Sequence, residues 1–204
     1  MSLNCSTCPL PAAITTITPN ACPENFGQIQ KIAIQRTGDD FDGGLNNIIT
    51  VLADWQTKIA ALDDTKIQVS PFIYNVVLTA GEAITNGGGD NSTLNGEVEL
   101  VGVNKTAVAG MFKGLSSAVI EALQSYNCEN ATGVYFFNAD GKIIAQELST
   151  GVYTPFPISS FFVGDKTNNG FATKDENALS FQINAGWSRN YKIVTPAFNP
   201  LTAI

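Results

Sequence analysis

The chain has 204 residues, enough for one domain with a substantial core, and only 14% of them are charged. It contains no histidine, the side chain most often used for general acid–base catalysis and a leading metal ligand. The net charge of −7 argues against a protein that grips nucleic acid through its phosphates. We therefore expect a binding or assembly protein with no cofactor, not an enzyme.

So small a charged fraction leaves little charged surface to keep a monomer soluble. We expect that copies of the same chain cover part of the apolar surface. No apolar run approaches the length of about 18 residues that a membrane helix needs, so we expect no membrane contact. The first residues lack the basic and apolar regions of a signal peptide.

Proline punctuates the beginning of the chain, and regular elements follow. Residues 1–25 contain prolines that exclude a helix, so this stretch is predicted to be an extended N-terminal arm. Residues 28–36 alternate around two isoleucines, which is typical of a half-buried strand. Large apolar residues recur at steps of three and four over 45–62, which predicts a helix.

The rest of the chain favours strands, with one more helix at 116–126. The Asp-Gly at the end of 138–141, between two β-rich runs, predicts a hairpin. Glycines and asparagines over 86–92 predict a flexible loop, and 164–177 is a second polar loop. The predicted strands are 66–78 with a bend at Pro71, 96–103, 108–114, 133–137, 142–145, 157–163, 179–183 and 191–194.

Two helices among so many strands predict a β-dominated α+β fold. The simplest layered solution is a β-sandwich or partly closed barrel flanked by one or two helices, with extended N- and C-terminal arms. We expect a single β-rich domain over 26–194 and a C-terminal arm over 195–204, where prolines again interrupt an uncharged sequence.

The cysteines offer one hint of a metal site. Cys5, Cys8 and Cys22 resemble three quarters of a four-cysteine zinc site, and the fourth ligand would have to be the distant Cys128. A redox pair is a second possibility, and unpaired thiols in an extended arm are a third. Since no second Cys-x-x-Cys motif or histidine is present, we favour unpaired thiols and expect no metal site.

Two other motifs resemble ligand-binding loops but lack the residues that such loops need. The acidic turn Asp39–Gly44 lacks the glycine and glutamate that an EF-hand loop needs at its sixth and twelfth positions. The run Gly87–Gly89 is not followed by Lys-Ser/Thr and opens no helix, so it is not a phosphate-binding loop.

Five segments of the sequence carry a resemblance to a known group of proteins: Cys22–Arg36, Lys66–Phe72, Gly114–Ser117, Gly133–Gly141 and Phe161–Asp165. They resemble segments of structural proteins of tailed phages and prophages of Bacteroidetes. The order of strands, central helix, Gly/Asn loop and extended ends is similar to that of phage tail-tube subunits.

The resemblance implies a virion subunit, assembled in the cytoplasm of a bacterial host together with other virion proteins. It implies homo-oligomers, commonly six-membered rings, stacked around a channel through which DNA passes without specific binding. The negative charge of each copy would help to repel the DNA phosphates. Alternatives are another virion part (a head fibre, collar or capsid decoration), a secreted β-sandwich module that binds carbohydrate or protein, and an enzyme using two carboxylates.

Contacts between copies are expected at the two arms and at the Gly/Asn loop, because these segments cannot build a core by themselves. No catalytic, metal-binding or cofactor-binding residue is proposed. The expected self-assembly residues are Pro9, Pro19, Phe26, Gly88, Asp90, Leu94, Phe198, Leu201 and Ile204.

Overall fold

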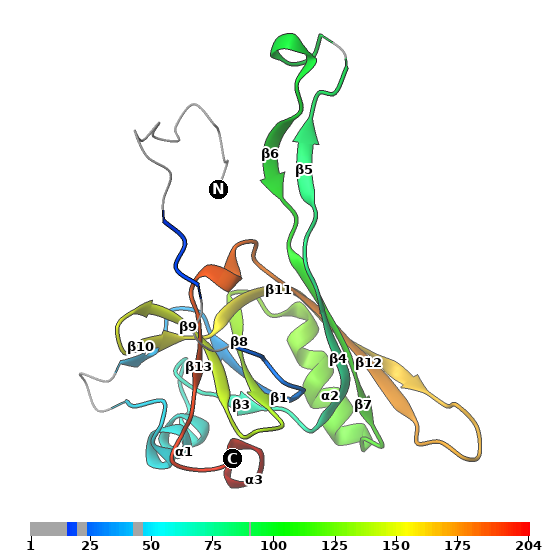
Figure 1. The fold of residues 1–204 in the computed structure, drawn as a ribbon. Helices are drawn as coiled ribbons and strands as arrows, with labels where there is room; N and C mark the ends of the chain where they lie inside the picture. Colours follow the sequence, from blue (N-terminus) through cyan, green and yellow to red (C-terminus); the bar gives the residue numbers. More distant parts are fainter. Residues whose placement is uncertain (1–15, 20–23, 43–46, 90) are drawn as a thin grey trace.

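The structure is a computed structural model, and it describes residues 16–19, 24–42, 47–89 and 91–204 (Figure 1). The strands are β1 (Ile29–Arg36), β2 (Phe41–Asp42), β3 (Gln68–Val69), β4 (Ile73–Thr79), β5 (Ala83–Asn86), β6 (Glu99–Val103), β7 (Thr106–Lys113), β8 (Thr132–Asn138), β9 (Ile143–Ser149), β10 (Val152–Thr154), β11 (Phe156–Thr167), β12 (Glu176–Ile183) and β13 (Tyr191–Val194). The helices are α1 (Leu52–Ala60), α2 (Ser117–Ser125) and α3 (Pro200–Ala203), with 3₁₀ turns η2 (Leu94–Gly96), η3 (Tyr126–Cys128) and η4 (Trp187–Arg189).

Two antiparallel layers meet at β8. Along one edge, β8 pairs with β1 over its whole length, and β1 pairs in turn with β3. The other edge of β8 is shared by two strands, because Val134 pairs with β11 whereas Phe136 pairs with β9. The strands β10, β2 and β13 continue the β9 side, and the order β11-β12-β7-β4 forms the second layer. Among the described strands none pairs with both β1 and β4, so the barrel stays open between them.

Strand β8 is buried along its entire length. Val134 and Phe136 face the core between the two layers, whereas Tyr135 and Phe137 face a second core on the opposite side. Aromatic and β-branched side chains suit a strand that is covered on both faces.

Each core is built from one face of β8 and its neighbours. The main core also takes side chains from both layers, and its buried members include Ile32, Ile34, Ile73, Val108, Phe112, Phe156, Val163, Leu179, Phe181 and Ile183. The second core is covered by α1, and its buried members include Ala33, Phe41, Ile49, Trp55, Ile67, Ile143 and Val194.

Helix α1 is shorter than the 45–62 helix that the spacing predicts. It begins at Leu52, and residues 43–46 lie outside the described chain. The four residues before the helix are all β-branched and have low helix propensity. They form a turn and not the predicted first turns of the helix: Ile48, Ile49, Thr50 and Val51. The turn places the carbonyl of Ile49 where it accepts a hydrogen bond from the Trp55 indole nitrogen at 2.8 Å.

Helix α2 matches the predicted helix closely and packs beside β11. Leu123 lies in the main core, and Val119 and Tyr126 pack against it. Just after the helix, the Asn127 side chain accepts a hydrogen bond from the Val163 amide and donates one to its carbonyl. These two bonds take the place of a neighbouring strand along this part of β11.

The predicted fold class is confirmed: the structure is a β-dominated sandwich flanked by helices, and it is not a closed barrel. The predicted strands are all present within a few residues, and β13 has the predicted bounds. Strands β2, β5 and β10 were not predicted from the sequence, and β2 lies in the segment that was expected to be an acidic turn. The helix α3 lies in the segment predicted to be an extended C-terminal arm, where Asn199 caps it by accepting a hydrogen bond from the Leu201 amide.

Candidate functional site

A long hairpin, formed by β5 and β6, projects from the body of the molecule (Figure 1). The hairpin continues the line of β4 and β7. The chain leaves the second layer after β4 along β5, and it returns along β6 into β7. Every side chain of β5 is exposed, and so is every side chain of β6 apart from the position of Gly102. We call residues 82–103 the ribbon.

Gly81 allows the two strands to approach closely where the ribbon begins. A Cβ atom at this position would lie 1.9 Å from the carbonyl oxygen of Asn104, which no real contact permits. The amide of Asn104 donates to the carbonyl of Glu82 at 2.9 Å, which fastens the base of the ribbon. A glycine is therefore required at the exit from the sheet.

The tip of the ribbon is closed by its own hydrogen bonds. The Gly89 amide donates to the Gly96 carbonyl, and the Gly96 amide donates to the Thr93 carbonyl, both at 3.1 Å. The Thr93 hydroxyl donates to the carbonyl of Glu97. The short turn η2 presents Leu94 at the extremity, with 81% of its surface exposed.

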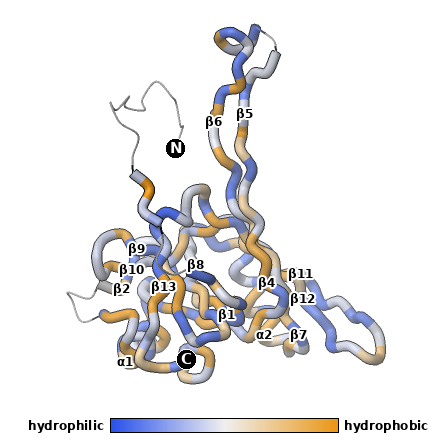
Figure 2. The backbone as a smooth tube through the Cα atoms, in the orientation of Figure 1, coloured by the Kyte–Doolittle hydropathy of each residue, from blue (hydrophilic) through white to orange (hydrophobic). Residues whose placement is uncertain are grey.

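The ribbon combines exposed apolar side chains with negative charge. Figure 2 shows apolar and polar positions interspersed along the ribbon. Its exposed large apolar side chains are Ile84, Leu94, Val98, Leu100, Val101 and Val103. Residues 82–103 contain four acidic residues, Glu82, Asp90, Glu97 and Glu99, and no lysine or arginine. An isolated two-stranded hairpin is only marginally stable in water, so a partner that covers these side chains would stabilise it.

The outer face of the second layer is the other unusual surface. This face is formed by the side chains of β4, β7, β12 and β11 that alternate with the buried ones and point away from the core. Across the middle of the face these side chains are small or uncharged. They are Val77, Thr79, Ala107, Ala109, Met111, Ala178, Ser180, Gln182, Ser159 and Phe162. Charges occur only toward the ends of this described face, at Lys105 and at the Lys113–Glu176 ion pair.

The predicted self-assembly residues fall into three groups. Gly88 and Leu94 lie together at the tip of the ribbon, and Pro19 is exposed. Pro9 and Asp90 lie outside the described residues. Four others contact their own subunit: Phe26 packs on Trp187 and Tyr191, and Phe198, Leu201 and Ile204 pack against the second core.

The C-terminal segment is fastened to its own subunit by more than apolar contacts. The Lys31 amine donates hydrogen bonds to the main-chain oxygens of Leu201 and Ile204, at 2.8 and 3.0 Å. Burial lowers the pKa of Lys31. These contacts are available inside one chain, and sequence reasoning missed them because Lys31 and Ile204 are far apart in sequence.

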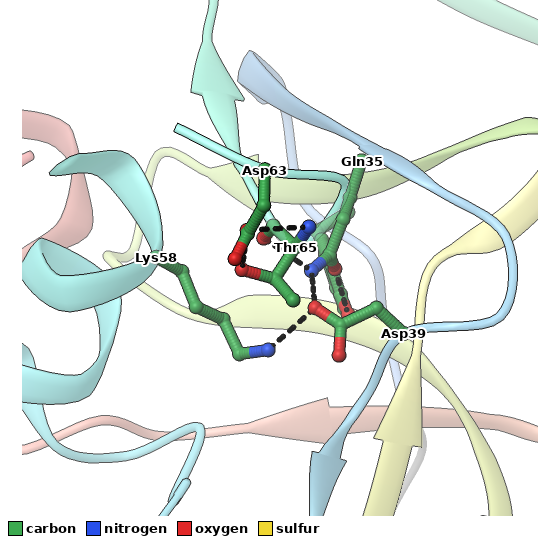
Figure 3. A network of polar contacts seen from close by, with 6 residues as sticks. Gln35, Asp39, Lys58, Asp63 and Thr65 are labelled. Atoms are coloured by element: carbon green, nitrogen blue, oxygen red, sulfur yellow. Dashed lines mark hydrogen bonds and ion pairs between the residues drawn. The ribbon is translucent and has the colours of Figure 1, made fainter. Parts of the chain in front are cut away.

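A network of polar and charged side chains lies near α1, and its geometry gives it a structural role (Figure 3). The Lys58 amine lies 2.6 Å from Asp39 Oδ2, and the Gln35 side-chain amide donates to the same oxygen. Gln35 also accepts from the Tyr135 hydroxyl at 2.9 Å and donates to the Thr65 carbonyl. The network thus joins α1, the acidic turn and two strands, and its polar atoms are partnered within the fold.

Burial also shapes the acid–base behaviour of this network. It raises the pKa of Tyr135 well above its ordinary value of 10.0, and the negative charges of Asp39 and Asp40 add to the effect. The phenol is therefore neutral and acts as a hydrogen-bond donor at ordinary pH.

The described ranges hold neither a cluster of metal ligands nor a helix suited to cross a membrane. They contain no group of three or more His, Cys, Asp or Glu side chains placed to hold a metal ion. Cys5, Cys8 and Cys22 lie outside these ranges, so the interpretation of the N-terminal cysteines stays a prediction, and Cys128 is an exposed free thiol. Of the described helices, none has both the length and the apolar character needed to cross a membrane.

No family model matches the sequence, and no curated protein matches it either. Among solved structures, the fold is similar to a chain of the anti-feeding prophage baseplate, determined by cryo-electron microscopy with 6-fold symmetrisation. The match covers 90% of this chain and 100% of that chain, with 13% identity and a TM-score of 0.29. At that TM-score the similarity carries no argument about function.

Proposed function

We propose that this protein is a structural subunit of a tailed-phage virion or a related assembly, and that its particular role is that of a tail-tube protein. The observation that carries the proposal is the ribbon, which projects from the body with its apolar side chains exposed. A surface of this kind is stabilised when another protein covers it, so the subunit is built to be part of an assembly.

The second layer suits the wall of a channel. Antiparallel strands from neighbouring subunits can lie side by side, because β4 pairs only with β7 among the described strands and its second edge is open. The outer face of this layer then faces a lumen. Its small, uncharged side chains offer no run of lysine or arginine to hold DNA phosphates, so a nucleic acid can pass without sticking.

The exposed apolar side chains of the ribbon and the small charged fraction of the whole chain favour contacts between identical copies. In this proposal copies form closed rings, commonly of six, and the rings stack through the ribbon and the N-terminal segment. Residues Pro9 and Pro19 belong to that segment, and their contacts stay part of the proposal. Other virion proteins bind at the ends of the stack, and assembly takes place in the cytoplasm of the bacterial host.

Electron microscopy of the purified full-length chain over a range of concentrations tests the proposal. We expect rings or stacked rings with a central hole. Fibres or side-to-side clusters without a hole would replace the tube role by that of a fibre, collar or decoration protein. Dispersed monomers at all concentrations would contradict an assembly role altogether.

A shortened variant isolates the contribution of the ribbon. Residues 83–103 are replaced by Asn-Gly, which suits a tight turn between the adjacent strands at Glu82 and Asn104. We expect a folded chain, because none of the described residues among those replaced has a buried side chain, and we expect that it no longer assembles. Retention of the same assemblies would show that the ribbon is not the connector.

A further inference from the structure

A groove of about 480 Å³ lies between the paired strands β1 and β3 on one side and α2 on the other. Its lining is mainly apolar and includes Pro71, Ala118, Ala122, Tyr126 and Ile204. Lys31 is the charged member of the lining, and none of the described residues that line it carries a carboxylate side chain.

Lys31 can receive one more acceptor. Two of its three N–H groups point to the main-chain oxygens of Leu201 and Ile204, and its amine lies 5.0 Å from the centre of the Phe72 ring. An ammonium group has three donors, so an incoming carboxylate can complete the set.

The tip of the ribbon has the complementary chemistry. Leu94 is its most exposed apolar side chain, and Glu97 follows three residues later. An apolar anchor with a nearby carboxylate matches an apolar groove with a single lysine.

The two surfaces cannot meet within one molecule. The ribbon extends away from the body, whereas α2 and β3 lie on the part of the body remote from the tip (Figure 1). A contact between tip and groove therefore joins different copies, and because the two patches differ it is of the head-to-tail kind.

We propose that the groove between α2 and β3 receives the Leu94 tip of the ribbon from a second copy of this chain. Leu94 enters between Ala118, Ala122 and Tyr126, and Glu97 approaches the Lys31 amine. This inference rests on the proposed assembly role and names the partner surface of the ribbon. Repetition of the contact links successive copies along the direction in which the ribbon points.

Cysteine cross-linking between separately purified variants tests the contact. In a background with Cys5, Cys8, Cys22 and Cys128 replaced by serine, one variant carries Leu94→Cys and the other Ala122→Cys. Both positions are exposed, so the variants are expected to fold like the parent chain, which circular dichroism checks. We expect the mixture, under mild oxidation, to give a disulfide between the two positions, identified by peptide mass mapping.

The matched control pairs Leu94→Cys with Ser188→Cys, an exposed position in η4 that is not part of the groove. Linkage to Ala122→Cys well above linkage to Ser188→Cys supports the contact. Equal linkage to both positions, or none to Ala122→Cys, overturns it.

A second comparison uses two exposed leucines. Leu94→Asp is expected to weaken self-association by about tenfold or more, because the side chain loses its burial in the groove. Leu62→Asp should leave self-association unchanged, since Leu62 is 96% exposed and lies outside both the ribbon and the groove. Sedimentation velocity measures both, and equal effects of the two substitutions overturn the proposal.

The outcomes also separate this inference from the proposed function. Rings seen by electron microscopy without the Leu94–Ala122 cross-link would leave the tail-tube role standing and remove the contact. Cross-linked open chains without rings would support the contact and remove the tube. Absence of both assembly and cross-linking overturns both.

Discussion

The Lys58 amine is buried beside Asp39 and above the Phe41 ring, so the stability of this site depends on both partners. An ion pair of this kind contributes little net stability relative to an apolar pair, but removal of one partner leaves the other charge unpaired. A substitution that removes only one partner of the ion pair should therefore lower the free energy of unfolding more than a substitution of both partners.

Lys58→Met should destabilise the fold by about 3 kcal/mol, at the low end for a buried pair because Asp39 is partly exposed. Urea denaturation measures the loss. Lys192→Met is the control, since its pair with Glu147 spans 3.9 Å and Lys192 is exposed, so its loss should stay below about 1 kcal/mol. Adding Asp39→Asn to Lys58→Met should recover part of the stability. Equal losses for the two lysine variants would contradict a structural role for the network.

Tyr135 makes the stability depend on pH at the alkaline end. Its folded-state pKa lies above the unfolded value of about 10, so above that pH the folded state holds a proton that the unfolded state has released. Stability is therefore complete below pH 10 and declines as the pH rises toward the folded-state pKa.

Tyr135→Phe should flatten this alkaline decline, although it weakens the fold at neutral pH by about 1–3 kcal/mol, because Gln35 Oε1 loses its donor. Urea denaturation at pH 8 and pH 11 measures both effects. Tyr74→Phe, at an exposed position, controls for the general effect of the substitution and of base. An alkaline decline as steep as that of the parent chain would show that another group is responsible.

At the scale of elements, the sequence predicts those whose side chains carry the signal themselves. The Asp-Gly turn before Lys142 and the aromatic run in β8 identified the central hairpin, and the apolar spacing of Val119 and Leu123 identified α2. The ribbon was only partly predicted, because β5 is exposed and shows no alternation between buried and exposed positions. Its length becomes apparent only when β5 is paired with β6.

Gly81→Ala should displace the ribbon without disturbing the core, because the added methyl group collides with the main chain of Asn104. We expect faster amide hydrogen exchange across β5 and β6, reduced assembly, and a melting temperature within a few degrees of the parent chain. Gly102→Ala is the matched control, since its Cβ meets only the Ile84 side chain at 3.9 Å. Similar exchange in the two variants would show that the close approach at Gly81 does not fix the ribbon.

The C-terminal segment illustrates what a linear pattern does not reveal. Prolines at 196 and 200 predict an irregular segment, but they do not indicate that Phe198, Leu201 and Ile204 find a surface on their own subunit. That surface is made from residues far away in sequence, including Lys31.

Removal of residues 198–204 should therefore lower the free energy of unfolding by about 3–5 kcal/mol, since three apolar side chains leave the second core. Chemical denaturation measures the change. Ala203→Ser, at an exposed position of α3, should be neutral and serves as the control. A truncated chain as stable as the parent would mean that the segment is free to bind elsewhere.

At the scale of the whole molecule, the sequence predicted the fold class and the location of the main strands, but not how the layers are joined. The division of one β8 edge between β11 and β9 depends on pairing between distant residues. The candidate surfaces were also only partly predicted. Gly88 and Leu94 were proposed as contact residues from the Gly/Asn run, and their contacts stay a prediction. The uncharged face of the second layer appears only once Ala109 and Ser180 are seen to be neighbours.

The double burial of β8 has a consequence for how the protein folds. Since the main core lies against one face of this strand and the second core against the other, neither core is complete until β8 is in place. The two tryptophans report on the two sides separately, because Trp55 lies in the second core and Trp187 packs against the main core. In Trp187→Phe and in Trp55→Phe, the fluorescence of the remaining tryptophan should follow the same denaturation curve as the far-ultraviolet circular dichroism. A fluorescence transition that precedes the loss of strand signal in either variant would mean that one core unfolds alone. Coincident fluorescence and circular-dichroism transitions in both variants would mean that the two cores unfold as one cooperative unit joined by β8.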